Sequence, residues 1–575
     1  MTVSTHYYAA LLPGFNAVAI REGALSCDAS RAPHVEAEIT VPLPGDWDTT
    51  TVTSPLTGDP VDVPVWTPTP EVLETVDPRE TPRLVLMAQK DNEAPYAWDL
   101  GVRERTINRR DATVTLKLAS DEALLSDYAP LADVLYTVSL ASSLRTLVGY
   151  VLDAAIPGAT LEATPATDAD MTPYWSVANL VKNPSAETNT TFWSNGQNGT
   201  GITRVSTAGY ATSGSYCFRI TAAAAGTAWL DYDGSMSVTP GRTYSVACDM
   251  RLGAGDPAKT GTTMVRFYDR NGNRIQDQSY VGAPLSTTWQ RQYNRVTAPA
   301  NATQATLHFG LNSAESGQNL HVDSVMFYEG IFATEYFDGG SVRTGYVCAW
   351  DGDGHASAST RTPDPVERDP ESVYWKAGQN ALEFLHPLVQ AAGLRLVCDG
   401  ARAWTLRDAE YVAPGTVSLT EGVNLITAEE TISRDAGLWY DARVTRYTWT
   451  DRNGIQQERV DAYALNTPYT RLTTLELQSA YPGPGRSQYA VQRAQGVGRE
   501  VTVSTVSDYA VVAEQPMLVT LGDAPVQLGT VRSVEFDLST DEMTITTRTV
   551  DTPAGAINLL SGTIDALTGT INDLS

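Results

Sequence analysis

Short segments in which hydrophobic and polar residues alternate, separated by turn-forming residues, make up most of this chain. Thr113–Leu118 alternates strictly and predicts a strand with one buried face. Residues 144–152 carry apolar side chains at helical spacing and follow two candidate N-caps, Ser142 and Ser143. The pattern as a whole predicts a mainly β protein of the α+β class.

The second half of the chain repeats this arrangement of helices and hairpins. A helix is predicted over residues 380–392, with a kink at Pro387 and an end at Gly393. Two hairpins are predicted, one from residues 394–398 and 403–407 and one from residues 531–538 and 543–549. We therefore expect two related α+β halves in the scaffold.

Residues 177–340 differ from the segments on either side, because Ser, Thr, Asn and Gly become more frequent there. A hairpin turn is predicted at Asn271-Gly272. The predicted strands are Tyr216–Thr221, Ala228–Tyr232, Thr243–Arg251, Thr263–Asp269, Trp289–Ala298 and Ala305–Gly310. Their even spacing predicts a β-sandwich inserted into a different protein.

The last 23 residues, 553–575, contain apolar residues at the 3-4 spacing of a heptad repeat. These residues are Ile557, Leu560, Ile564, Leu567, Ile571 and Leu574. The pattern favours a coiled coil that joins several chains. The alternative is a single amphipathic helix or a frayed end, because Gly562 and Gly569 each cost ~1 kcal/mol of helix stability. Ile at a with Leu at d nominally prefers two strands, so the heptads alone do not predict a trimer.

Composition narrows the class of protein. The net charge of −27 argues against nucleic-acid binding through phosphates, which needs a basic surface. The N-terminus lacks the pattern of a secretion signal, and no apolar run is long enough to span a membrane. The five cysteines are far apart and without a Cys-x-x-Cys pair, which predicts free thiols and synthesis in a reducing cytoplasm.

Motifs that would indicate catalysis are missing from the sequence. It contains no Gly-x-Ser-x-Gly elbow, no phosphate-binding Gly-x-x-x-x-Gly-Lys-Ser/Thr loop and no His-Glu-x-x-His. Asp351-Gly-Asp-Gly354 lacks the later acidic ligands of a calcium loop and is expected to be a turn. The sequence therefore favours a protein that is not an enzyme.

Four segments of the insert carry a resemblance. They are the opening Asn-Pro-Ser-Ala-Glu187, the strand ending at Arg251, the hairpin ending at Asn273 and the closing Val-Asp323-Ser-Val-Met-Phe327. The insert resembles jelly-roll carbohydrate-binding modules with galactose-binding-domain topology. The resemblance implies one structural Ca²⁺, with Glu187 and Asp323 as side-chain ligands; the alternative is that both only make hydrogen bonds at strand ends.

Sugar binding needs exposed aromatic rings beside a few polar groups. The rings in the insert are Trp193, Trp229, Tyr232, Tyr280 and Trp289. Trp193 and Tyr232 lie next to Asn/Gly and Asp/Gly loops and are the first candidates, with Trp229 and Trp289 next. The alternative is that these rings belong to the core, as most aromatic residues of a β-sandwich do.

The scaffold resembles the minor tail proteins of phages that infect actinobacteria. The resemblance rests on Tyr336-Phe-Asp-Gly339, Tyr346-Val-Cys-Ala-Trp350, the helix–hairpin over residues 384–406 and the strand pair over residues 526–549. It implies a homotrimeric hub at the tail tip, assembled in the host cytoplasm, with tube-like β-barrels that close the tail tube. The implied partners are the distal tail ring, the tape-measure protein, a tip fibre or needle, and host cell-wall polysaccharide.

This resemblance suggests five domains. They are 1–176 (tube-like barrel plus α+β), 177–340 (the insert), 341–490 (a second α+β region), 491–552 (the rest of a tube-like barrel) and 553–575 (the heptads). The alternative function is a secreted polysaccharide-degrading enzyme with an embedded carbohydrate-binding module. A cell-surface adhesin is a third reading.

Overall fold

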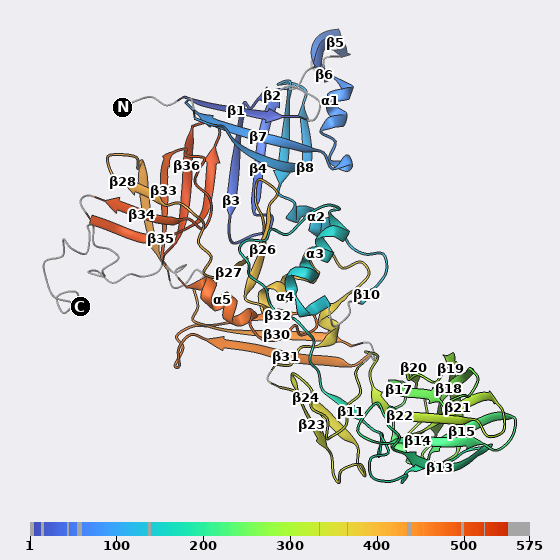
Figure 1. Cartoon of the computed structure of the whole chain (residues 1–575). Helices are drawn as coiled ribbons and strands as arrows, with labels where there is room; N and C mark the ends of the chain where they lie inside the picture. The colour runs from blue at the N-terminus through green and yellow to red at the C-terminus, as the bar shows by residue number, and fades with distance from the viewer. Residues whose placement is uncertain are drawn as a thin grey trace, which may run out of the picture.

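The computed structural model describes residues 5–549 with short gaps, and the protein is built mainly of β-strands, as predicted. Strands from both chain ends and a group of helices form a body, and the insert projects from one end of it (Figure 1). The gaps are 13–16, 43–44, 54–59, 92, 136–139, 333, 365, 434–438, 452–453, 496–498 and 522–523. The six heptad residues from Ile557 to Leu574 lie outside the described residues.

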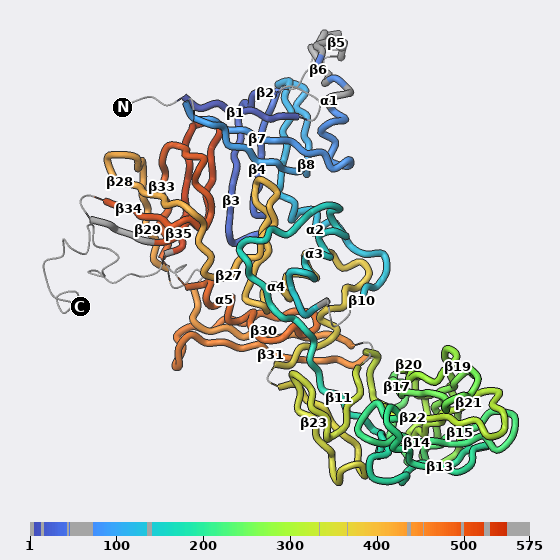
Figure 2. The backbone as a smooth tube through the Cα atoms, in the orientation of Figure 1, coloured from blue at the N-terminus to red at the C-terminus, as the bar shows by residue number. Residues whose placement is uncertain are grey.

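Strands from the two ends of the chain share one sheet, which has 13 strands in the part of the chain described. The link is the antiparallel pair of β3 (Glu22–Asp28) and β35 (Ala524–Asp537), in which Leu25 lies opposite Phe536. Figure 2 shows described strands from the N-terminal and C-terminal parts of the chain lying next to each other. The order is β2-β1-β7-β8-β9-β4-β3-β35-β36-β33-β29, with β34 and β28 attached to β35.

The other strands of this sheet follow the predicted alternation. On the N-terminal side they are β1 (His6–Leu11), β2 (Ala17–Ala19), β4 (Val35–Pro42), β7 (Arg83–Lys90), β8 (Tyr96–Asn108) and β9 (Thr113–Ala119). On the C-terminal side they are β28 (Val417–Thr420), β29 (Thr427–Ile432), β33 (Arg499–Val506), β34 (Pro516–Leu521) and β36 (Glu542–Thr549). A separate hairpin consists of β5 (Gly45–Thr53) and β6 (Pro60–Pro68).

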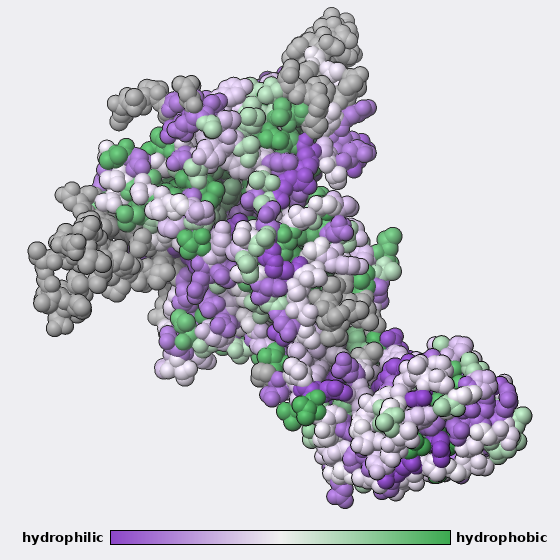
Figure 3. All heavy atoms as spheres, viewed as in Figure 1, coloured by the Kyte–Doolittle hydropathy of each residue, from purple (hydrophilic) through white to green (hydrophobic). Residues whose placement is uncertain are grey.

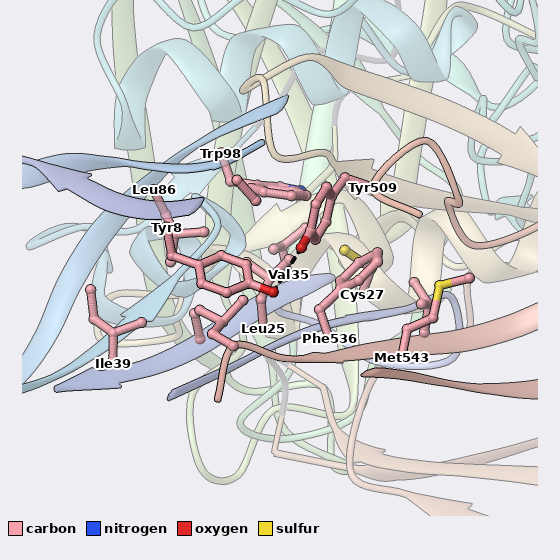
Figure 4. Close-up of a cluster of buried hydrophobic side chains, with 14 of the residues drawn as sticks. Tyr8, Leu25, Cys27, Val35, Ile39, Leu86, Trp98, Tyr509, Phe536 and Met543 are labelled. Carbon is pink, nitrogen blue, oxygen red and sulfur yellow. Dashed lines mark hydrogen bonds between the residues drawn. The ribbon is translucent and has the colours of Figure 1, made fainter. Parts of the chain in front are cut away.

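One hydrophobic core joins the two ends of the chain. Figure 4 shows its centre, where Tyr8 and Leu25 lie beside Tyr509 and Phe536. On β4 the buried residues occur at every second position from Val35, which is why the apolar face of this strand turns inward. Because both ends bury residues in this core, the first and last segments depend on each other for stability.

A helical layer lies below the sheet and combines segments from both sides of the insert (Figure 1). The predicted helix is α3 (Leu144–Ala155), and Ser143 Oγ accepts a hydrogen bond of 3.2 Å from the backbone N–H of Thr146. The second predicted helix is α4 (Ala381–Ala391), which contains Pro387 and is followed by Gly393 at a φ of +74°. The remaining helices are α1 (Pro70–Thr75), α2 (Glu122–Asp127), α5 (Arg486–Ala494) and the 3₁₀ turns η1 (Pro78–Glu80), η2 (Leu140–Ser142) and η3 (Pro370–Val373).

Smaller sheets complete the body. The predicted hairpin after α4 is present as β26 (Leu394–Cys398) and β27 (Trp404–Asp408). The others are β10 (Val134–Leu135) with β25 (Tyr374–Trp375), and β31 (Gln456–Ala464), β30 (Ala442–Thr450) and β32 (Leu472–Leu477) in that order. The β10–β25 pair joins the chain before the insert to the chain after it.

The insert leaves and re-enters the body through neighbouring strands. β11 (Val177–Asn179) pairs with β24 (Ser359–Pro363), and β24 pairs with β23 (Tyr346–Trp350). Val177 of β11 belongs to one hydrophobic cluster with Met326 and Tyr328 of β22, which attaches this connecting unit to the sandwich. The two connections lie side by side, which allows a complete domain to be inserted without disturbing the body.

The insert is a sandwich of two antiparallel sheets, as predicted. One sheet has β12 (Trp193–Asn195), β15 (Gly226–Tyr232), β21 (Gln304–Ala314), β18 (Lys259–Tyr268) and β19 (Arg274–Leu285) in order, with β16 (Met236–Ser237) beside β21. The other has β13 (Gly199–Val205), β14 (Cys217–Ala222), β22 (Asn319–Glu329), β17 (Thr243–Leu252) and β20 (Gln290–Thr297). Gly272 has a φ of +81° in the predicted hairpin turn.

Candidate functional site

The outer face of the sheet that contains β21 carries the most promising surface of the insert. Leu307 and Phe309 of β21 point into the core, because both are fully buried and belong to its hydrophobic cluster. Side chains alternate along a strand, so His308, Gly310 and Asn312 lie on the opposite face. This outer face is the part of the sheet that a ligand can reach.

The indole of Trp229 lies across Gly310 on this face. Trp229 and Gly310 are directly opposite each other on β15 and β21, and Trp229 is partly exposed. A Cβ added to Gly310 would come within 2.7 Å of Cζ3 of Trp229. The missing side chain at residue 310 therefore leaves room for the ring to lie over the backbone of the strand.

Polar side chains occupy the next row of the same face. Nδ1 of His308 lies 2.7 Å from Oδ1 of Asp231, and Nε2 of His308 lies 3.2 Å from the hydroxyl of Thr306. The rings of His308 and Trp229 meet edge to face at 6.5 Å. Asp231 keeps the His308 ring in a defined orientation beside the indole.

On the other side of Gly310, Asn312 is also held in place. Its side-chain amide donates to the hydroxyls of Thr262 and Thr260 at 2.6 and 3.2 Å. With both N–H groups directed at threonines, the amide oxygen is the part of Asn312 that remains to accept a hydrogen bond. The surface thus offers one flat ring flanked by a carboxylate and an amide.

Trp193 and Tyr232 are core residues, and the expectation that they form the first sugar platform is wrong. They are 5% and 2% exposed, and their rings lie 5.0 Å apart. The indole N–H of Trp193 donates to the carbonyl of Asn183 at 2.9 Å, and the hydroxyl of Tyr232 accepts from the backbone N–H of Lys182 at 3.0 Å. The two residues are opposite each other on β12 and β15, so one inward-facing ring places the other inward as well.

Trp289 is partly exposed but lies away from Trp229. Its indole N–H donates to the carbonyl of Gly209 at 3.3 Å, and the Arg251 guanidinium lies 5.7 Å from its ring centroid. Arg251 belongs to β17, in the other sheet of the sandwich. The four predicted rings are therefore divided, with two in the core, Trp229 on β15 and Trp289 directly before β20 of the other sheet.

Glu187 and Asp323 bind adjacent residues in the second half of the loop that connects β13 to β14. Glu187 accepts the backbone N–H groups of Ser215 and Tyr216 at 2.9–3.1 Å. Asp323 is fully buried and accepts the backbone N–H groups of Thr212 and Ser213 at 2.7 and 3.1 Å. Burial raises the pKa of Asp323 to about 7, although these hydrogen bonds act in the opposite direction.

A second carboxylate lies beside Asp323. The hydroxyl of Thr212 lies 2.8 Å from Oδ2 of Asp249 and 3.1 Å from Oδ2 of Asp323, yet it carries a single proton to donate. The described residues include no cluster of three or more His, Cys, Asp or Glu with the geometry of a metal site. Hydrogen-bond donors of the loop contact Glu187 and make most of the hydrogen bonds of Asp323. Calcium binding at these two residues stays a prediction.

Comparison with known protein families identifies the type of domain that the insert represents. Residues 178–316 match the family model of a carbohydrate binding domain. The insert is a carbohydrate-binding module. No curated protein matches the chain. Among the described residues, no helix has the length and apolar character needed to cross a bilayer.

Three solved structures illustrate what the module is similar to. The enzymatically active domain of tailspike protein 4 of bacteriophage CBA120 is 21% identical over 26% of this chain and 21% of its own length, with a TM-score of 0.23. The family 16 carbohydrate-binding module-2 is 16% identical over 26% and 99%, at 0.21. The CBM22-1 xylan-binding domain of Xyn10C from Paenibacillus barcinonensis is 13% identical over 28% and 99%, at 0.22. The chain thus spans about a fifth of the tailspike domain.

The polar residues around Trp229 were missed by sequence reasoning, although a signal for them exists. In Ala305–Leu311 the apolar residues occupy every second position, which places Thr306, His308 and Gly310 on the other face. That alternation separates a surface row from a core row. It does not show that Asp231, 77 residues away, lies next to His308.

Proposed function

We propose that the module binds a polysaccharide through the surface formed by Trp229, Asp231 and Asn312, with the buried His308 holding Asp231 in place by a hydrogen bond. The observation that supports the proposal most strongly is the partly exposed indole of Trp229, which lies against Gly310 on the outer face of the sheet. One face of a pyranose ring presents C–H groups, and such a face stacks on an indole. The hydroxyl groups at the rim of the sugar then meet the carboxylate of Asp231 and the amide oxygen of Asn312.

The character of the surface supports a polar ligand. On the side seen in Figure 3, the insert presents mainly polar and weakly hydropathic residues, with only scattered strongly hydrophobic ones. A protein partner would require a broader apolar patch at the centre of the interface. A sugar chain needs only the ring and a few hydrogen-bonding groups.

The test compares two tryptophan variants of the full chain. Binding to a panel of soluble and insoluble polysaccharides is measured by affinity electrophoresis and pull-down for the wild type, Trp229→Ala and Trp289→Ala. We expect W229A to weaken binding at least ten-fold and W289A to retain it, with circular dichroism confirming that both are folded. Loss of binding in W289A but not in W229A would assign the site to the other sheet.

For the whole chain we propose a structural role as a trimeric hub of a phage tail tip, which carries the module toward host cell-surface glycan. Two features support this role. The strands of the two chain ends join side by side through β3 and β35, which suits a pair of tube-like units in each subunit. The module is held away from them at the far end of the body (Figure 1).

The alternative is a polysaccharide-degrading enzyme, and the two functions predict different products. A hub with a binding module releases no reducing ends from a polysaccharide that it binds. Extended incubation of the purified chain with each bound polysaccharide, followed by a reducing-sugar assay, distinguishes them. Release of oligosaccharides that survives the W229A substitution at high substrate concentration would support the enzyme.

A further inference from the structure

A cavity of about 310 Å³ in the body is lined by five arginines. It lies between α4, α5, the hairpin strand β26 and the last two strands of the large sheet, far along the chain from the module. The arginines are Arg31, Arg395, Arg493, Arg532 and Arg548. In a protein of net charge −27, such a concentration of positive charge is a local exception.

Carboxylates balance only part of this charge. Arg31 pairs with Glu36 at 2.9 Å, and Arg532 pairs with Glu500 at 2.8 Å. One buried carboxylate, that of Glu514, forms ion pairs with three arginines.

Those three are Arg395, Arg407 and Arg493. Arg407 and Arg493 lie 3.1 and 3.3 Å from Glu514, and Arg395 contacts it as well. Arg548 has no acidic partner among the residues that the structure describes. Three guanidinium groups therefore share one buried carboxylate and Arg548 has none, which leaves an excess of positive charge.

Two of these arginines also have N–H groups without a hydrogen-bond acceptor. Within the described part of the chain, Nε of Arg395 and Nη1 of Arg548 are buried and unpaired. Arg395 is only 8% exposed. Burial, together with repulsion from neighbouring arginines, lowers the pKa of Arg395 to about 9 and that of Arg548 to about 10. An unpaired buried N–H is costly, and an anion in the cavity would remove that cost.

We propose that this cavity binds the phosphate or sulfate group of a small ligand. Guanidinium groups donate paired N–H bonds to tetrahedral oxyanions, and a doubly charged group matches the excess charge better than a single carboxylate does. The cavity volume of about 310 Å³ is roughly ten times the ~30 Å³ that one water molecule occupies in the liquid. The cavity therefore has room for more than one oxyanion. The remaining walls include Leu396, Val397 and Tyr489, which suit the organic part of a phosphate ester.

The test is isothermal titration calorimetry of the full chain at constant ionic strength. The probes are inorganic phosphate, sulfate, glucose 1-phosphate and glucuronate. We expect saturable binding of one phosphate or sulfate group per chain. Tighter binding of the ester identifies a phosphorylated ligand, and tighter binding of inorganic phosphate identifies the free ion.

Variants link the binding to the arginines. Arg548→Gln should weaken the affinity at least ten-fold, and Arg548→Lys should recover part of the loss. Arg103→Gln, which removes a remote surface pair with Asp127, is the matched control and should leave the affinity unchanged. Arg493→Gln is the second variant if R548Q does not fold. The proposal is overturned by an absence of saturable binding, by an unchanged affinity in the folded arginine variants, or by glucuronate binding as tightly as phosphate.

Discussion

The hydroxyl of Tyr509 donates a hydrogen bond of 2.8 Å to the hydroxyl of Tyr8, 501 residues earlier in the chain (Figure 4). Tyr8 in turn donates to Asp541 at 2.8 Å, and Nδ1 of His6 lies 2.7 Å from the Tyr509 hydroxyl. Burial raises the pKa of Tyr509 to about 12, so its hydroxyl stays protonated. This chain of hydrogen bonds connects the first strand to the C-terminal segment.

Tyr509→Phe should therefore lower the free energy of unfolding by about 1 kcal/mol, the usual value of a buried hydrogen bond. The measurement is urea denaturation followed by intrinsic fluorescence. Tyr7→Phe is the matched control, because Tyr7 is 55% exposed and its hydroxyl is near solvent. Equal stability of the two variants would show that the hydroxyl chain contributes nothing at the junction.

Glu122 should make the body less stable as the pH rises. Burial raises the pKa of this carboxyl from 4.5 to about 7. The folded protein then binds more protons than the unfolded chain between about pH 4.5 and 7, so stability falls across that range as pH increases. Glutamine does not titrate and can replace both hydrogen bonds, accepting from the N–H of Cys398 and donating to Ser120.

We expect Glu122→Gln to match the wild type at pH 4.5 and to exceed its stability by roughly 1–3 kcal/mol at pH 8. Chemical denaturation at a series of pH values measures the difference. A constant offset between the two proteins at every pH would mean that Glu122 does not titrate in this range.

Gly310→Ala should disturb the Trp229 surface without touching the ligand itself. The new Cβ would meet Cζ3 of the indole at 2.7 Å, which forces the ring away from the strand. We expect polysaccharide affinity to fall about ten-fold while thermal stability changes little. The chain has 12 tryptophans, so the contribution of Trp229 is obtained as the difference between emission spectra with and without Trp229→Phe, recorded with and without Gly310→Ala. A difference spectrum that Gly310→Ala leaves unshifted would contradict the displacement.

Calcium bound by Glu187 and Asp323 should raise the melting temperature of the chain. Asp323 is buried and shares the single Thr212 proton with Asp249, which also pairs with Arg291 at 3.5 Å. A cation at Asp323 would therefore give a buried carboxylate a partner of opposite charge. At a Ca²⁺ concentration 100-fold above Kd the gain is about 2.7 kcal/mol. Asp323→Asn should abolish the gain, whereas Asp277→Asn, in a remote pair with Arg266, should keep it. Identical melting curves in Ca²⁺ and in chelator would contradict calcium binding at this site.

The proposed trimeric hub predicts that the heptad segment holds three chains together. Light scattering of the full chain should give a mass of about 186 kDa, which is three times 61.9 kDa. Truncation after Pro553 removes all six heptad residues and should release monomers. A trimer that survives truncation would place the interface in the body.

Local patterns in the sequence predicted the elements well where one face of a segment is buried. Ser143 begins α3, Gly393 follows α4, and the hairpin at Asn271-Gly272 is present, because caps and turns depend on a few adjacent residues. The β-sandwich of the insert was predicted from the same kind of information. The six predicted strands all coincide with observed strands to within a few residues.

The prediction of the sugar-binding rings was wrong because it relied on the loop residues next to each ring in the sequence. Trp193 and Tyr232 lie next to Asn/Gly and Asp/Gly loops, but the pairing of β12 with β15 places both rings in the core. Which face of a strand is buried depends on the sheet stacked against it, and that sheet is formed by residues distant in the chain.

By itself, the sequence determined the mainly β class, the inserted module with its strand spacing, and the net negative charge of the whole chain. Each of these is a property of local pattern or of composition. Only the tertiary structure decided that β3 pairs with β35, that Trp229 lies over Gly310 beside His308, and that five arginines line one cavity. These relationships join residues tens to hundreds of positions apart. They follow from packing free energy summed over the whole fold, which no local window of the chain contains.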